Sequence, residues 1–297
     1  MTTIGFIGLG HMGLPMALNC LKNGYGVIGY DLQQEAMQAL KKQGGKCAQS
    51  LAEAAQHSEV IITMLQTGAQ VKAVTAGPDG LFANAKADTL YIDCSTIDVE
   101  SSREAHALAA HHQLAALDAP VSGGVAGAEA GSLTFMVGGE KAIFQRAQPV
   151  LKCMGQNIIH AGNAGNGQAA KICNNMILGI SMIAVSESFV LAERLGLDAK
   201  KLQEVVHHAS GQCWTMDKYV PVADILPNVP ANHNYEPGFT AAMMLKDLRL
   251  SQHCAAQSKL LLPMANKAQQ LYEAFIASGK SEKDFSAIIL AIKGDEE

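Results

Sequence analysis

The 297-residue chain is poor in charged residues (16%) and in aromatic residues (5%), and it has a single tryptophan. It has no cluster of basic residues, and its formal net charge is −5. Such a chain gives no electrostatic reason to expect nucleic acid or an anionic membrane as a partner. The hydrophobic content of 48% is enough for a large core and excludes intrinsic disorder. At about 150 residues per domain, the length predicts two domains.

Paired cysteines are also lacking. The seven cysteines are odd in number, and no two of them are spaced as C-x-x-C. This usage excludes a disulfide framework and a zinc site, and it predicts buried thiols in a reducing compartment.

Long uninterrupted hydrophobic runs are absent as well. The longest apolar stretch, Met176 to Ala192, is broken by Ser181 and Glu187, which favours a buried helix over a membrane span. The first strand-like run begins almost at Met1, which leaves no room for a signal peptide. We therefore expect a cytoplasmic protein.

Glycine is frequent, and its most informative use is at the N-terminus. Gly8, Gly10 and Gly13 form G-x-G-x-x-G between a strand-like run at 3–7 and a helix-like run at 12–22. This context predicts a dinucleotide-binding turn, in which the pyrophosphate approaches the backbone and the N–H groups at the helix start. His11 and Met12 lie within the same turn, so we expect them to contact the cofactor too.

Asp31 follows the next apolar run at about the spacing expected for a ribose-binding carboxylate. A carboxylate there accepts hydrogen bonds from the adenine-ribose hydroxyls and repels a 2′-phosphate, which predicts NAD as the cofactor in preference to NADP. The alternative interpretation is that Asp31 only caps the helix that follows it.

Strand-like and helix-like runs alternate along the first half of the chain. The alternation predicts parallel strands with right-handed helical crossovers. We expect a Rossmann-type α/β domain over residues 1–163, with helices at 33–43 and 50–57. Its expected strands are 3–7, 27–30, 59–64 and 89–93, and the sheet is extended by 114–118, 133–138 and 157–160.

After residue 161 the pattern becomes helical. We expect an all-α domain over residues 164–297, joined to the first domain by a long helix at 168–195 that stops at Gly196. Four prolines mark 221–238 as a loop. Further helices are expected at 199–209, 240–257, 260–278 and 283–292. Because such apolar helices need a large burying surface, we expect a homodimer or homotetramer.

Two segments pair turn glycines with polar side chains. Ser122 and Gly123 lie in Asp-Ala-Pro-Val-Ser-Gly-Gly, where exposed N–H groups and a hydroxyl suit a substrate carboxylate, although the turn could be purely structural. Lys171 and Asn175 follow a glycine-rich turn and share one helix face. On the helix alone, a lysine that extends to solvent is an equally good interpretation of Lys171.

A third segment places a charged pair, Lys246 and Asp247, among apolar residues of an expected helix. Such a pair needs a partner, which is either a ligand or only the other member of the pair. Trp214 is interpreted as a core or interface aromatic at least as readily as a wall of a substrate pocket.

Together with the glycine turn at 8–13, these motifs resemble the β-hydroxyacid dehydrogenases, and the resemblance covers nearly the whole chain. It implies that Lys171 is the general acid/base, that Asn175 helps to bind the substrate carboxylate with Ser122 and Gly123, and that Lys246 lies against cofactor and substrate. It also implies cofactor contacts from loops at strand ends, although the family more usually has proline in place of Gln66. These contacts come from Leu65, Gln66, Gln70 and Thr96.

The resemblance implies NAD-dependent oxidation of a short 3-hydroxy acid without a metal, because a lysine performs the proton transfer. The expected reaction converts (S)-3-hydroxyisobutyrate to methylmalonate semialdehyde, as in valine breakdown. A tartronate semialdehyde (2-hydroxy-3-oxopropionate) reductase, or another short-chain semialdehyde reductase, is the alternative. A non-catalytic nucleotide-binding protein is a distant one, because Lys171 and Asn175 are both present.

Overall fold

The computed structural model describes residues 2–294, which form two compact units. The first unit ends at Lys171 and the second begins at Ile172. This division lies inside the long helix α9 (Asn166–Arg194), whereas the sequence-based boundary lies at 163/164, just before that helix. A helix that belongs to both units has no break in its backbone to mark a boundary.

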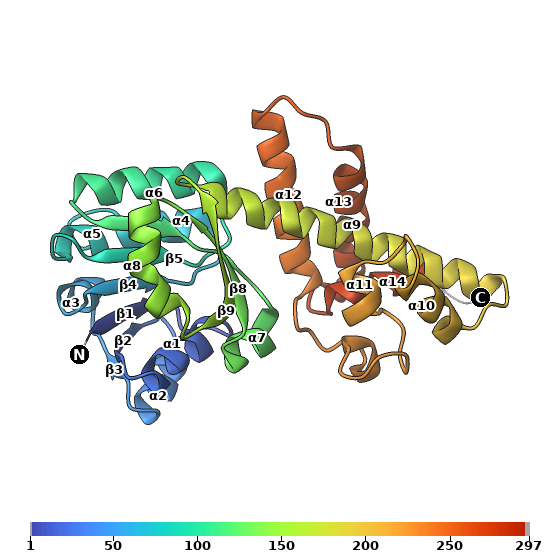
Figure 1. Cartoon of the computed structure of the whole chain (residues 1–297), viewed down its shortest axis with the longest axis horizontal. Helices are drawn as coiled ribbons and strands as arrows, with labels where there is room; N and C mark the ends of the chain where they lie inside the picture. Colours follow the sequence, from blue (N-terminus) through green and yellow to red (C-terminus); the bar gives the residue numbers. More distant parts are fainter. Residues whose placement is uncertain (1, 295–297) are drawn as a thin grey trace. The chain divides into compact units, whose positions relative to one another are not determined.

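The strands of the first unit form a single sheet (Figure 1). They are β1 (Thr3–Ile7), β2 (Gly26–Tyr30), β3 (Lys46–Cys47), β4 (Val60–Thr63), β5 (Leu90–Asp93), β6 (Ala115–Asp118), β7 (Val121–Ser122), β8 (Leu133–Gly138) and β9 (Gly155–Gly162). In space the order is β3-β2-β1-β4-β5-β6-β8-β7, with β9 paired to β8. Strands β1 to β6 are parallel, and β8 is antiparallel to both β6 and β7. The expected Rossmann-type sheet with an extension is confirmed.

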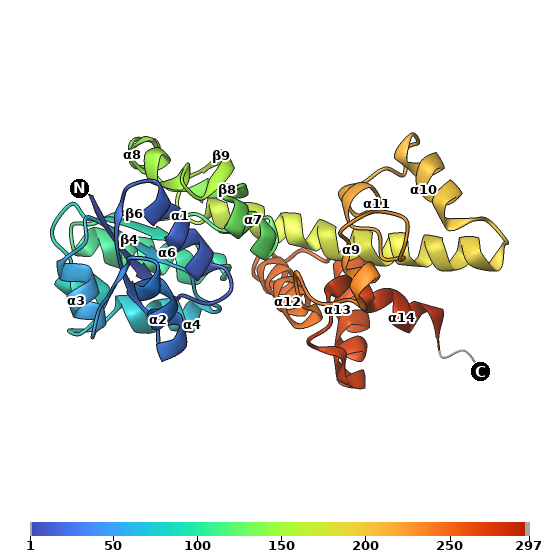
Figure 2. The ribbon, with the colours of Figure 1, turned by 90° about the horizontal axis from the view of Figure 1, so that it is seen from below.

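Alternate residues of the buried strands serve two cores, one on each face of the sheet. Phe6, Ile62 and Ile92 pack in one core with α1 (Gly13–Lys22), α2 (Gln34–Lys42) and α8 (Lys141–Leu151). Ile7, Ile61 and Tyr91 pack in the other with α3 (Leu51–Gln56), α5 (Leu81–Asn84) and α6 (Val99–His111). Helices therefore cover both faces, as Figure 2 shows from a second direction. The helices α4 (Gly68–Thr75) and α7 (Gly124–Ala130) complete the unit.

The carboxyl ends of the parallel strands stand in register. Ile7 pairs with Tyr30 and with Thr63, Thr63 pairs with Asp93, and Asp93 pairs with Asp118. The segments that follow these residues therefore emerge at one edge of the sheet, where ligands of this type of fold bind.

The second unit is helical in its described part, as expected (Figure 2). Residues of α9, α12, α13 and α14 form one core, which contains Met182, Met244 and Tyr272. A second core joins α9 to α10 and α11 through Phe189, Leu202 and Met216. The helix bounds are α10 (Ala199–His207), α11 (Trp214–Lys218), α12 (Ala241–Gln257), α13 (Pro263–Phe275) and α14 (Ile288–Lys293), with short helices η1 (Pro230–His233), η2 (Ile276–Lys280) and η3 (Phe285–Ala287).

Some sequence-based expectations about burial are corrected. Among the cysteines only Cys20 and Cys94 are buried, and Cys173 is exposed. Trp214 is 53% exposed and stacks on Tyr219, so it is not a core residue of this chain. The expectation that α9 is a buried helix and not a membrane span is not among these corrections. Helix α9 is long and apolar enough to span a membrane by length and composition only, and 44% of its most apolar window is buried inside the protein.

Candidate active site

The glycine turn at 8–13 has the geometry of a dinucleotide-binding loop. Gly8 has φ +91°, and a Cβ there would lie 2.3 Å from the Met64 carbonyl oxygen. A Cβ at Gly13 would lie 1.9 Å from the Gly8 carbonyl oxygen, so only glycine lets α1 begin against this turn. A Cβ at Gly10 would meet no protein atom within 4 Å. Packing within the described chain therefore does not require glycine at position 10, and the surface of the turn is open there.

Asp31 is tied to that turn. One carboxylate oxygen accepts a hydrogen bond from the Leu9 N–H at 2.6 Å, and the other accepts one from the Gln33 N–H at 2.8 Å. Gln33 is the N-cap of α2, so the capping interpretation describes part of the observed geometry. Asp31 thus fixes the loop before α1 and the loop before α2 together, and its neighbour Leu32 is exposed.

The loops after β4 and β5 are also held by internal hydrogen bonds. Leu65 N–H donates to the Ser95 hydroxyl oxygen at 2.9 Å, which joins the two loops. The Gln70 side chain forms a capping box with Thr67 at the start of α4 and also accepts from the Gln66 N–H at 2.9 Å. Gln70, predicted to contact the cofactor, therefore has a visible role in shaping the loop that contains Gln66.

A buried carboxylate lies beneath these loops. Asp93 accepts hydrogen bonds at Oδ1 from the Thr63 hydroxyl at 2.8 Å and from the Ser95 N–H at 3.1 Å, whereas its buried Oδ2 has no hydrogen-bond partner. Burial raises the pKa of Asp93 from 3.8 to about 6, and hydrogen bonds from Ser95 and Thr63 oppose that rise. The sequence-based interpretation did not identify this residue.

The turn predicted to bind a carboxylate follows β7. Ser122 is half-buried at the end of that strand, and Gly123 has φ +135°, which a residue with a side chain rarely adopts. Gly123 directly precedes α7. The turn therefore has a conformation that requires glycine.

Lys171 lies in the second turn of α9 and is 7% exposed. A lysine that extends its ammonium group freely into solvent is excluded by this burial. Asn175 follows one turn later and is also buried. The two side chains lie on one side of the helix, as their i, i+4 spacing predicts.

Within the second unit, Asn175 is oriented by Asp247 of α12. The amide Nδ2 of Asn175 donates to Asp247 Oδ2, and the Asn174 amide donates to Asn175 Oδ1 at 2.9 Å. The ammonium nitrogen of Lys246 lies 3.5 Å from Asp247 Oδ1. The predicted pair Lys246–Asp247 is thus an ion pair, and its buried carboxylate also holds the amide of Asn175.

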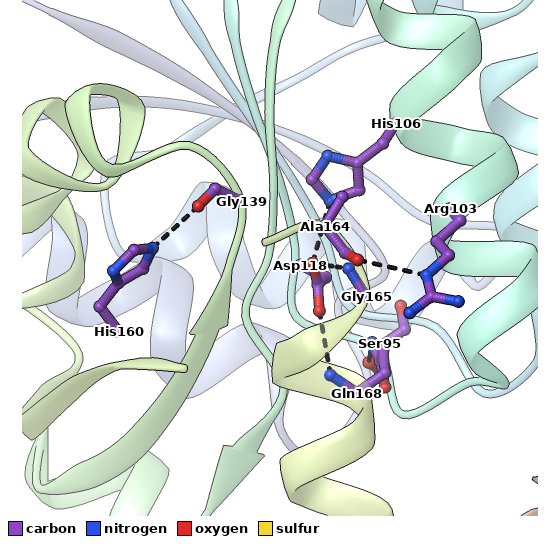
Figure 3. A network of polar contacts seen from close by, with 9 residues as sticks. All are labelled: Ser95, Arg103, His106, Asp118, Gly139, His160, Ala164, Gly165 and Gln168. Atoms are coloured by element: carbon purple, nitrogen blue, oxygen red, sulfur yellow. Dashed lines mark hydrogen bonds and ion pairs between the residues drawn. The ribbon is translucent and has the colours of Figure 1, made fainter. Parts of the chain in front are cut away.

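Sequence reasoning missed the residues that fix the start of α9. Asp118 accepts hydrogen bonds from the Gly165 N–H at 2.8 Å and the Gln168 N–H at 2.9 Å, and His106 Nε2 lies 3.0 Å from the same carboxylate (Figure 3). A carboxylate at the positive end of a helix is electrostatically favourable. Asp118 is the first residue of the Asp-Ala-Pro-Val-Ser-Gly-Gly segment, and nothing in that segment indicates a partner so distant in the sequence.

Comparison with known proteins identifies both halves of the chain. Residues 3–162 match the family model of the NAD binding domain of 6-phosphogluconate dehydrogenase. Residues 165–292 match the model described as NAD-binding of NADP-dependent 3-hydroxyisobutyrate dehydrogenase. The two models together span both structural units.

Similar proteins cover nearly the whole chain. A probable mitochondrial 3-hydroxyisobutyrate dehydrogenase of Dictyostelium discoideum is 46% identical, over 96% of this chain and 89% of that protein. An NAD-dependent L-serine dehydrogenase of Pseudomonas aeruginosa is 44% identical, over 97% of each chain. The solved structure of Mycobacterium tuberculosis 3-hydroxyisobutyrate dehydrogenase with L-serine superposes with a TM-score of 0.94 at 45% identity, over 99% of this chain and all of that one.

The fold, the glycine turn and these full-length similarities agree with the resemblance seen in the sequence. They identify the chain as an NAD-binding oxidoreductase that acts on CH–OH groups. The chain belongs to the 3-hydroxyisobutyrate dehydrogenase family.

Proposed function

We propose that the chain oxidises (S)-3-hydroxyisobutyrate to methylmalonate semialdehyde with NAD, as a step of valine breakdown. The observation that supports this most directly is the pair Lys171 and Asn175, two buried polar side chains one turn apart on α9. A lysine held in a buried position one turn from a buried amide can exchange a proton with a hydroxyl group bound beside it.

In the proposed reaction, Lys171 takes the proton of the substrate hydroxyl. NAD, when bound, would supply the acceptor for the hydride that leaves the carbon bearing this hydroxyl group. Gly8, Gly10 and Gly13 lie along the pyrophosphate with His11 and Met12, and Asp31 binds the adenine ribose. Leu65, Gln66 and Thr96 contact the dinucleotide from the loops after β4 and β5, and Gln70 shapes the first of these loops.

Ser122, Gly123 and Asn175 bind the substrate carboxylate in this proposal, and Lys246 lies against cofactor and substrate. Charge-assisted hydrogen bonds of this kind contribute roughly 1.5–3 kcal/mol each. They also fix the reacting carbon, so removal of the carboxylate charge should lower turnover as well as affinity.

L-serine is a second candidate substrate. It shares the carboxylate and the β-hydroxyl group of 3-hydroxyisobutyrate, and it differs at C2, where an ammonium group replaces a methyl group. One relative is named an L-serine dehydrogenase, and a similar solved structure contains L-serine. A pocket that rejects serine must be apolar near C2, because a buried ammonium group needs polar partners.

We also propose a cellular location and an oligomeric state for the chain. Relatives include a mitochondrial protein and a bacterial one, and we propose a cytoplasmic location for this chain. Ile177 and Leu191 of α9, and Leu195 directly after it, expose large apolar side chains. We propose that a second copy of the chain covers them in a homodimer or homotetramer.

The test is NADH formation over a panel that contains (S)-3-hydroxyisobutyrate, its methyl ester, L-serine and D-glycerate, the alcohol that corresponds to tartronate semialdehyde, with NAD and with NADP. We expect the highest kcat/KM for (S)-3-hydroxyisobutyrate with NAD. Lys171→Ala should lower kcat by about 10²–10⁴-fold. The exposed Lys141→Ala variant is the matched control and should keep wild-type turnover. Equal kcat/KM for acid and ester, or normal turnover of Lys171→Ala at neutral pH, would contradict the proposal.

A further inference from the structure

Gln168 is a fully buried side chain in the first turn of α9, and both ends of its amide are bonded to the loop after β5. Its Oε1 accepts a hydrogen bond from the Ile97 N–H at 3.1 Å. Its Nε2 donates to the Ser95 carbonyl oxygen at 2.7 Å (Figure 3). These two backbone groups lie on either side of Thr96. One side chain therefore fixes the backbone around Thr96 from both directions.

The backbone of Gln168 is fixed as well. Its N–H donates to the buried carboxylate of Asp118, which also accepts from Gly165, so the start of α9 is held at the end of β6 (Figure 3). Gly167 allows this close approach, because a Cβ there would lie 2.3 Å from the Met136 carbonyl oxygen. The base from which the Gln168 side chain extends is thus rigid.

Lys171 lies three residues after Gln168 on the same helix, so the two side chains face the same side. One helical turn connects Lys171 to Gln168, and the two side-chain hydrogen bonds of Gln168 connect it to the backbone on either side of Thr96. All of these groups belong to the first unit. A buried apolar side chain would fill the same space, but it would leave the Ile97 N–H and the Ser95 carbonyl without these partners.

We propose that Gln168 is a positioning residue for hydride transfer. It holds the loop that contains Thr96 in a fixed position relative to Lys171. The inference rests on the proposed function, in which Thr96 contacts the cofactor and Lys171 moves the proton. Displacement of reacting groups by about 1 Å lowers rates by as much as 10²-fold even where binding is retained. The expected signature is therefore a loss in kcat with little change in affinity.

The experiment compares Gln168→Met, which keeps the volume and loses both hydrogen bonds, with the wild type. Asn84→Leu is the matched control, because the Asn84 amide also bonds two backbone carbonyls, those of Pro78 and Gly80, away from the carboxyl edge of the sheet. Each protein is assayed for kcat, for KM of both substrates and for melting temperature. The isotope effect with substrate deuterated at the carbinol carbon and the amide hydrogen exchange of residues 94–98 are measured as well.

For Gln168→Met we expect kcat to fall about 10–100-fold, with KM for NAD within about threefold and an increased isotope effect. Exchange over 94–98 should be at least about tenfold faster, because the Ile97 N–H loses its acceptor. Asn84→Leu should keep kcat within about twofold even where it lowers the melting temperature equally. If Gln168→Met does not fold, Gln168→Asn, which is too short to reach both groups, takes its place.

Two results would overturn the inference: kcat of the Gln168 variant within twofold of wild type, or exchange over 94–98 no faster than in Asn84→Leu. Failure of the proposed function looks different, because the wild type itself would then oxidise none of the 3-hydroxy acids. In that case the exchange rate over 94–98 still decides whether Gln168 fixes the Thr96 loop.

Discussion

The buried carboxylate of Asp93 should impose a measurable pH dependence on stability, and Asp93→Asn should remove it. Its Oδ1 receives hydrogen bonds from Thr63 and Ser95, but its Oδ2 has no hydrogen-bond partner and no access to water. The pKa therefore rises from 3.8 to about 6. At about 1.4 kcal/mol per unit, this rise makes ionisation of Asp93 about 3 kcal/mol less favourable in the folded chain than in the unfolded one.

The direction of this pH dependence follows from the number of protons that the folded and the unfolded chain bind. Between pH 4 and pH 6 the folded chain retains the Asp93 proton, whereas the unfolded chain has lost it. The contribution of Asp93 to the free energy of unfolding is therefore fully present below pH 4, and it falls as the pH rises through about 6. Over the range from pH 4 to pH 7.5 the expected fall is about 2 kcal/mol.

The measurement is urea unfolding of the wild type, of Asp93→Asn and of Asp79→Asn, an exposed control, at a fixed protein concentration between pH 4 and pH 7.5. The asparagine keeps an oxygen that accepts from Thr63 and Ser95, so the local hydrogen bonds survive. The difference between Asp93→Asn and wild type should shift by about 2 kcal/mol in favour of the variant as the pH rises. A difference that depends on pH no more than that of the exposed control Asp79→Asn would refute the reasoning.

Three further outcomes are expected. Asp31→Ser combined with Leu32→Arg should raise the ratio of kcat/KM for NADP to kcat/KM for NAD. The first change removes a carboxylate, and the second adds a cation at Leu32, which is 87% exposed. An unchanged ratio would contradict this expectation. Asp247→Asn should lower kcat about 10–100-fold with little change in NADH affinity, since the charge-assisted bond that orients Asn175 is lost; kcat within twofold would contradict it. Asp284→Ala should lower the free energy of unfolding by at least about 3 kcal/mol, measured by urea titration, because its buried carboxylate accepts from two hydroxyl groups and several backbone N–H groups; a loss below about 1 kcal/mol would contradict it.

Features set by local sequence pattern could be predicted. The strands with buried apolar runs and the long helix α9 were predicted close to their observed bounds, and the glycine turn was predicted from its spacing and its strand–helix context. The strands β3 and β7 have two residues each, which is too short for any periodicity to mark them.

The contacts that shape the site could not be read in the same way. Gln168 reaches Ser95 and Ile97 over 73 and 71 residues of sequence, and Asp118 reaches Gly165 over 47. No local pattern encodes such partners. Gln70 is different, because Thr67 three residues before it forms a capping box that the sequence already contains.

The two neighbouring carboxylates at the edge of the sheet differ in the hydrogen bonds that such long-range contacts give them. Asp93 and Asp118 stand in register on adjacent strands, and both are buried. Asp118 receives N–H donors from the start of α9 on both of its oxygens and lies against His106, so it anchors that helix to the end of β6. Asp93 receives donors on one oxygen alone, and the charge of Asp118 adds to the burial that raises its pKa. Both oxygens of Asp118, which holds the start of the helix that carries Lys171, thus receive N–H donors, whereas one oxygen of Asp93 receives none.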